Sequence, residues 1–210
     1  MVLSNVFDVD TIEQAKQIIL TPIGDHSTES RWQNETEYLL SLLDKLYYFD
    51  EYTIVLDYGC GIGRMAKALI QKYDCHVVGV DTSPAMRSLA IEYVSSKKFT
   101  CCAPEDLGPN FVDVALAIWV LQHCPDVERD IALIRKTLLP YAGLFVVNGH
   151  KRYLPTENGW VDDGKNIYDM LNVEYSKQIP SEYVGDVPCF WATTVREKGK
   201  HRGQKTKNPA

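Results

Sequence analysis

Residues 53–82 read TIVLDYGCGIGRMAKALIQKYDCHVVGVDT. The segments 53–57 and 76–81 are β-branched and apolar and each ends in an acid, which predicts two buried strands. Between them a glycine-rich loop precedes a run of good helix formers. The glycines of this loop are Gly59, Gly61 and Gly63. Strand, glycine loop, helix and strand in this order form the βαβ unit of many nucleotide-binding domains.

The glycine loop and the second acid indicate what such a unit binds. Glycine has no Cβ, so the loop backbone can approach a ligand closely. The helix that follows begins with unpaired N–H groups that favour a polar or anionic group. Asp81 ends its strand where a carboxylate can accept hydrogen bonds from two ribose hydroxyls. The dinucleotide fingerprint G-x-G-x-x-G needs glycine at position 64, where this chain has Arg64, so a nicotinamide oxidoreductase ranks low.

With Asp57 just ahead of it, the G-x-G-x-G loop resembles the first motif of the class I S-adenosylmethionine (SAM) dependent methyltransferases. Residues 78–84 look like their second motif, and residues 111–123 look like the fourth motif of the small-molecule enzymes. The resemblance covers about residues 53–147. It implies a three-layer, Rossmann-like α/β fold with a seven-stranded, mostly parallel sheet and an antiparallel last strand. It also implies SAM as the cofactor and S-adenosylhomocysteine as its product.

The same resemblance implies a set of cofactor contacts around the methionine, ribose and adenine portions. They are Asp57, Gly59, Gly61, Gly63, Asp81, Thr82, Met86, Ala103, Glu105 and Trp119. In the family an acid often follows the third strand, but here Cys102 and Ala103 stand there. Glu105 or Asp106 would substitute, or backbone amides alone would read the adenine edge. Trp119 would lie near the sulfonium, since an aromatic face suits a cation, and the alternative is a tryptophan packed in the core.

Two histidines are candidates for a general base. His123 follows the predicted fourth strand, on the edge of the sheet where ligands bind in open α/β folds. The alternative is a histidine that is hydrogen-bonded within a loop. His150, after the fifth predicted strand, is the second candidate. The predicted substrate contacts are Trp32, with a tryptophan packed in the core as the alternative, and Arg152, Tyr153 and Trp160, with a surface loop as the alternative.

The remaining pattern predicts one domain over residues 1–196, with a helical cap at 1–50 and a basic, flexible tail at 197–210. Predicted helices lie at 11–20, 30–48, 83–96, 126–139 and 166–171, and predicted strands at 98–102, 111–119, 143–148, 173–179 and 189–196. Residues 140–143 read as a turn, 149–172 as mostly irregular, and 181–188 as the connection between the last two strands.

Charge and cysteine content restrict the possible partners. The 210 residues carry a net charge of −6, yet residues 196–210 hold six basic residues and one acid, so the rest of the chain carries −11. Such an acidic body is not typical of a nucleic-acid surface, although the tail could contact phosphate. The six cysteines show no C-x-x-C spacing, no metal-ligand cluster stands out, and no apolar run spans a membrane or reads as a signal peptide. We expect a cytoplasmic protein with free thiols.

These observations predict methyl transfer from SAM to a small-molecule acceptor. Two alternatives stay open, an RNA- or protein-directed methyltransferase and a catalytically degenerate SAM-fold module that serves a partner protein. Residues 117–120 lack the paired prolines that DNA amino-methylating enzymes carry after the fourth strand. The only Pro-Cys pair, at 188–189, is not where cytosine-C5 enzymes place theirs. The intact glycine loop and Asp81 argue against the degenerate module.

Overall fold

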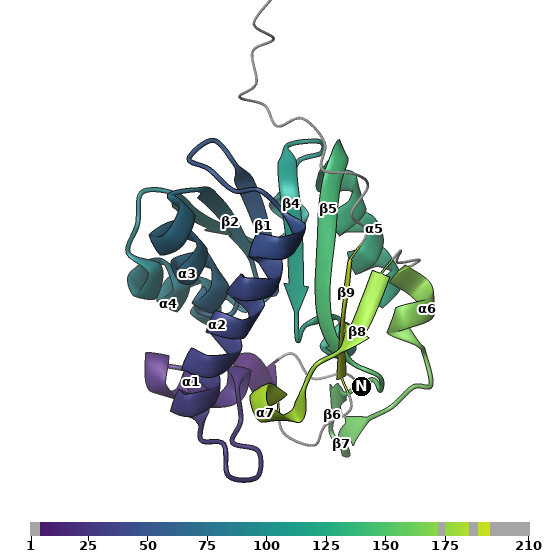
Figure 1. Cartoon of the computed structure of the whole chain (residues 1–210). Coiled ribbons are helices and arrows are strands. Elements are labelled where there is room, and N and C mark those ends of the chain that lie inside the picture. The colour runs from purple at the N-terminus through teal and green to yellow at the C-terminus, as the bar shows by residue number, and fades with distance from the viewer. Residues whose placement is uncertain (1–4, 172–174, 185–188, 194–210) are drawn as a thin grey trace, which may run out of the picture.

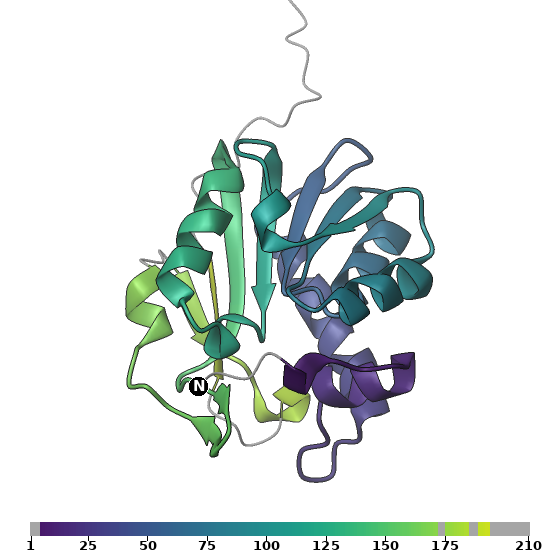
Figure 2. The ribbon, with the colours of Figure 1, turned by 180° about the vertical axis from the view of Figure 1, so that it is seen from behind.

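A seven-stranded sheet with helices on both faces organises the chain (Figures 1 and 2). The computed structural model describes residues 5–171, 175–184 and 189–193. The strand order is β3-β2-β1-β4-β5-β9-β8. The strands are β1 (Ile54–Tyr58), β2 (His76–Val80), β3 (Phe99–Cys102), β4 (Val112–Ile118), β5 (Leu138–Gly149), β8 (Tyr175–Gln178) and β9 (Cys189–Thr193).

The direction of the strands places the ligand edge of the sheet. β1 pairs in parallel with both β2 and β4, so the chain reverses its direction of winding between these neighbours. Ligands of open α/β sheets bind at such a switch point, outside the carboxyl ends of the strands. β9, the last strand, is antiparallel to both β5 and β8. The predicted fold, with a mostly parallel sheet and an antiparallel last strand, is confirmed.

Alternating side chains of the strands build a separate core on each face. On β1, Val55 packs with α2, α3 and α4 on one face, and Leu56 packs with α5 and α6 on the other. The α-helices are α1 (Ile12–Ile19), α2 (Thr28–Leu46), α3 (Arg64–Tyr73), α4 (Pro84–Val94), α5 (Val127–Thr137), α6 (Ile167–Leu171) and α7 (Ser181–Val184). As the sequence predicts, Ser83 caps α4, and its hydroxyl accepts the Met86 N–H at 3.2 Å.

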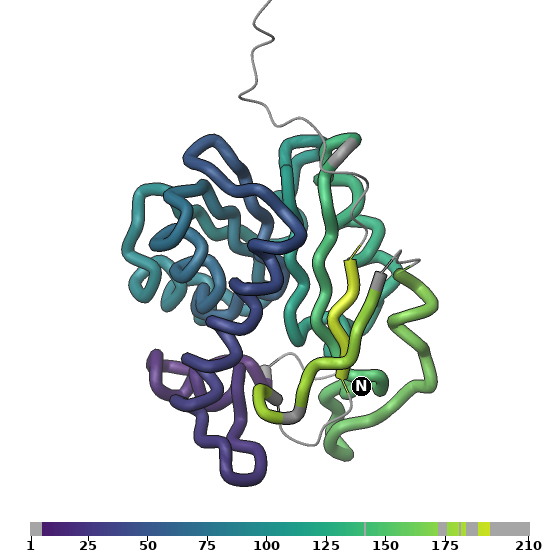
Figure 3. The backbone as a smooth tube through the Cα atoms, viewed as in Figure 1, coloured from purple at the N-terminus to yellow at the C-terminus, as the bar shows by residue number. Residues whose placement is uncertain are grey.

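Several short elements gather at the carboxyl edge of the sheet. They are α1, α7, the 3₁₀ turns η1 (Asn5–Phe7) and η3 (Leu121–His123), and a hairpin of β6 (Leu154–Thr156) and β7 (Gly159–Val161) (Figure 1). The remaining 3₁₀ turn, η2 (Pro104–Asp106), follows β3. From this edge α2 runs obliquely across the sheet, with α7 close to it (Figure 3). The rings of Tyr38 and Tyr183 stack between α2 and α7 with centroids 4.0 Å apart.

The structure corrects two expectations about secondary structure. Residues 140–143 do not form a turn, because β5 begins at Leu138, which pairs with Val112 ahead of a register shift. The stretch 149–172 is not irregular throughout, since it contains the β6–β7 hairpin. Parts of the last predicted strands, at 173–174 and 194–196, lie outside the described residues, as does the basic tail at 197–210.

Candidate cofactor site and active site

The loop between β1 and α3 has a backbone that only glycine adopts readily. The φ angles of Gly59 and Gly61 are +73° and +53°, in the left-handed region where a Cβ is strained. A Cβ on Gly59 would lie 2.2 Å from the Val120 side chain, and one on Gly61 would lie 2.5 Å from the Ile19 side chain of α1. The loop therefore packs too closely for side chains, and α1 lies directly over it.

Asp81 is bound to this loop. At the carboxyl end of β2, its Oδ2 accepts the Gly61 N–H at 3.0 Å and its Oδ1 accepts the Ser83 N–H at 2.9 Å. Burial raises the pKa of this half-buried carboxyl above its ordinary value, while the backbone donors oppose that shift. The structure thus brings together the glycine loop and the second acid of the sequence motif. Each oxygen retains further acceptor capacity.

Asp57, the acid ahead of the loop, is a buried group with an open acceptor. Its side chain is 3% exposed, and its Oδ2 makes no hydrogen bond with any residue of the described part of the chain. Burial raises the pKa of Asp57 to about 7, although the nearby Arg64 guanidinium lowers it. An unpaired buried oxygen next to the glycine loop fits a domain that binds a polar ligand.

Glu35 of α2 connects the elements around the loop, and the sequence analysis missed it. This fully buried carboxylate accepts the Trp119 indole N–H at 2.7 Å and the Arg64 guanidinium at 2.9 Å. Its other oxygen accepts from Arg31 at 3.0 Å, and Arg31 also donates to the Thr21 carbonyl at 2.6 Å. One carboxylate therefore holds α2, α3 and the end of β4 together. The i,i+4 spacing of Arg31 and Glu35 was the available sequence signal.

Trp119, the residue directly after β4, has an uncommon backbone conformation. Its φ is +58°, in the left-handed region that a bulky residue occupies only when its surroundings hold it there. The ring is half-buried between two hydrophobic clusters, and its N–H is used by Glu35. The structure thus fixes Trp119 at the switch-point edge of the sheet, and its contact with a sulfonium stays a prediction.

His123 of η3 lies in a closed hydrogen-bond network. The Gly149 N–H donates to Gln122 Oε1 at 2.9 Å, which turns the Gln122 amide nitrogen toward His123 Nε2 at 3.1 Å. His123 Nδ1 lies 2.7 Å from the Tyr153 carbonyl and must therefore carry the hydrogen. Burial lowers the pKa of His123, so the neutral ring with hydrogen on Nδ1 is the form that fits these partners.

Aromatic side chains surround His123 at the carboxyl edge. Its ring centroid lies 5.2 Å from that of Trp160 on β7 and 5.7 Å from that of Phe7 in η1. Trp160 is 55% exposed, and Tyr153 is also exposed. Three segments that are distant in sequence thus form one aromatic surface beside the candidate base. The predicted substrate role of Tyr153 and Trp160 fits this position and stays a prediction.

Arg152 has an interior position that the sequence analysis did not expect. Its side chain is completely buried, and its guanidinium donates to the carbonyls of Leu121 and Cys124 at 2.6 and 2.5 Å. It also forms an ion pair with Asp163 at 3.2 Å. These contacts use the guanidinium to position η3. Direct contact with an acceptor stays a prediction, and the observed role of Arg152 is structural.

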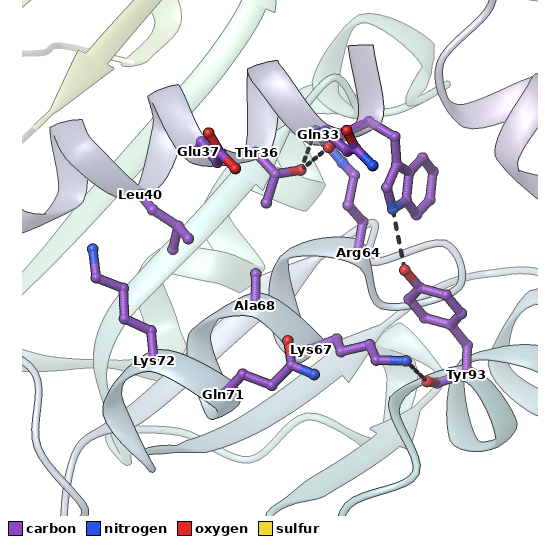
Figure 4. Close-up of a pocket in the computed structure, with 11 residues that line it drawn as sticks. Gln33, Thr36, Glu37, Leu40, Arg64, Lys67, Ala68, Gln71, Lys72 and Tyr93 are labelled. Carbon is purple, nitrogen blue, oxygen red and sulfur yellow. Dashed lines mark hydrogen bonds between the residues drawn. The ribbon is translucent and has the colours of Figure 1, made fainter. Parts of the chain in front are cut away.

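Trp32 lines a groove between α2 and α3 (Figure 4). Its indole N–H donates to the Tyr93 hydroxyl at 3.1 Å, and the Arg64 guanidinium lies 5.7 Å from the ring centroid. The groove encloses about 450 Å³, and Lys67 at its wall donates to the Tyr93 carbonyl at 2.8 Å. The lining residues come from α2, α3 and α4, and Trp32 also packs in one hydrophobic cluster with Ala15 of α1 and Ile62 of the glycine loop.

The other predicted contacts occupy more varied positions. Met86 is buried under α1, Thr82 is exposed, and Ala103 is half-buried after β3. Glu105 is exposed, 3.4 Å from Arg129. His150, the second base candidate, is exposed and hydrogen-bonded to Gln178 at 2.9 Å. The four predicted adenine contacts therefore lie around the ends of β2 and β3, and their contact with the cofactor stays a prediction.

The sheet order, and the glycine loop and Asp81 at the carboxyl ends of β1 and β2, define a Rossmann-like α/β domain of the kind that binds nucleotides. Residues 56–146 match a family model described as a methyltransferase domain. The fold and this match support membership of the class I SAM-dependent methyltransferase superfamily.

Two curated relatives are similar to this chain in sequence, and one solved structure is similar in fold. N-demethylindolmycin N-methyltransferase from Streptomyces griseus is 33% identical over 104 residues, which cover 46% of this chain and 44% of the relative. Phosphoethanolamine N-methyltransferase from Triticum aestivum is 36% identical over 142 residues, 63% of this chain and 28% of the relative. This chain thus spans less than half the length of these curated relatives. Phosphoethanolamine N-methyltransferase 2 of Haemonchus contortus, solved with SAM, has the same fold, with TM-score 0.65, 16% identity, and coverage of 90% of this chain and 57% of that one.

The described residues contain neither a membrane-spanning helix nor a cluster of metal ligands. No helix in residues 5–171, 175–184 and 189–193 is long and apolar enough to cross a membrane. Within the same residues, no cluster of three or more histidine, cysteine or acidic side chains could hold a metal ion.

Proposed function

We propose that this protein transfers a methyl group from SAM to a small-molecule acceptor. The observation that carries the proposal is the hydrogen bond from the Gly61 N–H to Asp81. It joins the glycine loop to the acid proposed to bind the ribose, at the switch point of the sheet. When bound, SAM supplies an electrophilic methyl group on a sulfonium. The chain itself must bind the cofactor, align the acceptor and exclude water.

The residues present fit this cofactor. The loop glycines would present their backbone to its methionine portion, and Val120 and Ile19 pack against Gly59 and Gly61. Asp81 would accept hydrogen bonds from the ribose with the acceptor capacity that its two backbone donors leave free. Around the adenine we propose the four residues at the ends of β2 and β3, namely Thr82, Met86, Ala103 and Glu105.

Replacing Asp81 with alanine is expected to weaken binding of SAM and S-adenosylhomocysteine by about 10- to 100-fold, because hydrogen bonds to a charged group are lost. Titration calorimetry of the wild type and Asp81→Ala measures the two affinities. Asp169→Ala, which removes an exposed carboxylate on α6, serves as the matched control and should bind like the wild type. Equal affinities for wild type and Asp81→Ala would contradict the ribose assignment.

We further propose His123 as the general base for an acceptor that arrives protonated. In the neutral ring with hydrogen on Nδ1, His123 Nε2 can accept a proton from the acceptor once its hydrogen bond with the Gln122 amide is broken. His123→Ala should lower the turnover number by about 10²- to 10⁴-fold. Because burial lowers the pKa of His123, wild-type activity should fall only below pH 6.5, and this limb should be missing in the variant. Full activity of His123→Ala at saturating acceptor would exclude the role.

The similar proteins suggest which acceptors to test first. Several of them are named as N-methyltransferases, including those from Streptomyces griseus, Triticum aestivum and Caenorhabditis elegans. We therefore propose a small amine as the acceptor, held against the aromatic surface of Phe7, Tyr153 and Trp160. A screen of amines with radiolabelled SAM tests this, and labelling of RNA or protein in place of amines would favour the macromolecular alternative.

A further inference from the structure

Two thiols from distant parts of the chain meet beside the glycine loop. The sulfur atoms of Cys60, in the loop, and Cys101, on β3, lie 3.7 Å apart. Their segments are separated by β2, and they meet because β2 has a glycine at the crossing. Gly79 pairs in register with Cys101, and a Cβ on Gly79 would lie 2.9 Å from the Cys60 sulfur. The missing side chain of Gly79 is therefore what brings the two sulfurs together.

The two thiols differ in access. Cys60 is buried, whereas Cys101 is half-buried and nearer to solvent. Because Cys60 is buried and Cys101 is not, Cys101 is the thiol that an oxidant reaches first, and the hydrogen bond with Cys101 together with burial raises the pKa of Cys60. Cys102, the next residue, packs with the hydrophobic cluster on the opposite face of the sheet. The chain thus offers a neighbouring thiol that cannot reach Cys60 in this fold.

We propose that Cys60 and Cys101 form an oxidative modification site that closes into a disulfide when the protein meets a hydroperoxide. The Cys101 sulfur attacks the peroxide, breaks its O–O bond, and becomes a sulfenic acid with release of one water, or of an alcohol from an organic peroxide. The Cys60 sulfur then attacks the sulfenic sulfur, the S–O bond breaks, and a second water leaves with the Cys60 proton. Both thiols are oxidised and the peroxide is reduced.

Closure of this disulfide acts on the glycine loop. The sulfurs must approach by about 1.6 Å to reach bonding distance. The loop side of the link is held by the N–H groups of Gly59 and Cys60, which both donate to the Val80 carbonyl, at 2.7 and 2.9 Å. Cys60 is followed by Gly61, whose N–H holds Asp81. Oxidation should therefore shift the cofactor site, and this consequence rests on the proposed function.

The test is peroxide treatment of the whole chain followed by peptide mass spectrometry without reduction. The expected product is a single linked pair of peptides that contain Cys60 and Cys101, with loss of two thiols that dithiothreitol restores. Cys101→Ser should give no linked pair, while Cys102→Ser should give the same pair as the wild type. Absence of the pair in the wild type, or a link through Cys102, would overturn the proposal.

Calorimetry with S-adenosylhomocysteine then measures the consequence for binding. Oxidation should change the affinity of the wild type and of Cys102→Ser by about fivefold or more, and that of Cys101→Ser should not change. An unchanged affinity in a fully linked sample would overturn the coupling to the loop. If the reduced, folded wild type does not bind S-adenosylhomocysteine, the proposed function fails, while the peptide map still decides the modification site.

Discussion

Replacing Glu35 with glutamine is expected to lower the free energy of unfolding by about 3–5 kcal/mol. The wild-type carboxylate is fully buried and neutralises Arg31 and Arg64, which are both 5% exposed. A glutamine of the same size removes the negative charge that pairs with both buried guanidinium groups. Because domains are stable by only about 5–15 kcal/mol, the loss is a large share of the total. Urea unfolding of wild type and variant measures the difference.

Glu37→Gln is the matched control for this result. It makes the same chemical change two residues along α2, at an exposed position on the groove between α2 and α3. Its free energy of unfolding should stay within about 0.5 kcal/mol of the wild type. If Glu35→Gln unfolds at the same urea concentration as Glu37→Gln, the Glu35 cluster does not stabilise the junction of α2, α3 and β4.

The local part of the fold could be predicted from the sequence because its determinants are close together in the chain. Glycine spacing, the acids that end β1 and β2, and the cap at Ser83 each depend on a few adjacent residues. The sheet arrangement depends on long-range pairing. Its seven mostly parallel strands and antiparallel last strand followed from the resemblance to a family, whereas the strand order itself was not predicted. The start of β5 at Leu138 was missed because pairing with Val112 overrides the turn signal of Pro140.

The missed part of the candidate site consists of contacts between distant segments. Nothing near Glu35 in the sequence points to Trp119, which is 84 positions away and reaches it from the far end of β4. The same reason hid the sulfur pair of Cys60 and Cys101. Arg152 was predicted to contact the substrate because charged residues are usually exposed. Its burial against the carbonyls of Leu121 and Cys124 can be seen only in the three-dimensional structure.

Asp57→Asn is expected to change how stability depends on pH. The pKa of Asp57 is about 7 in the folded chain and about 3.9 when unfolded, so the folded state binds the extra proton between these values. A group whose pKa is raised by folding stabilises the protein at low pH, and this contribution is lost as pH rises through the folded pKa. Between pH 5 and pH 7 the wild type should lose about 2 kcal/mol that Asp57→Asn does not lose.

Urea unfolding at pH 5, 6, 7 and 8 gives the difference between wild type and Asp57→Asn at each pH. The opposite contribution of His123, whose pKa is lowered by burial, is present in both proteins and cancels in this difference. Asp169→Asn, an exposed acid, should run parallel to the wild type over the whole range. Parallel curves for Asp57→Asn as well would mean that Asp57 is ionised in the folded chain. In that case Arg64, which the Glu35 carboxylate also binds, neutralises Asp57 more strongly than burial opposes its charge.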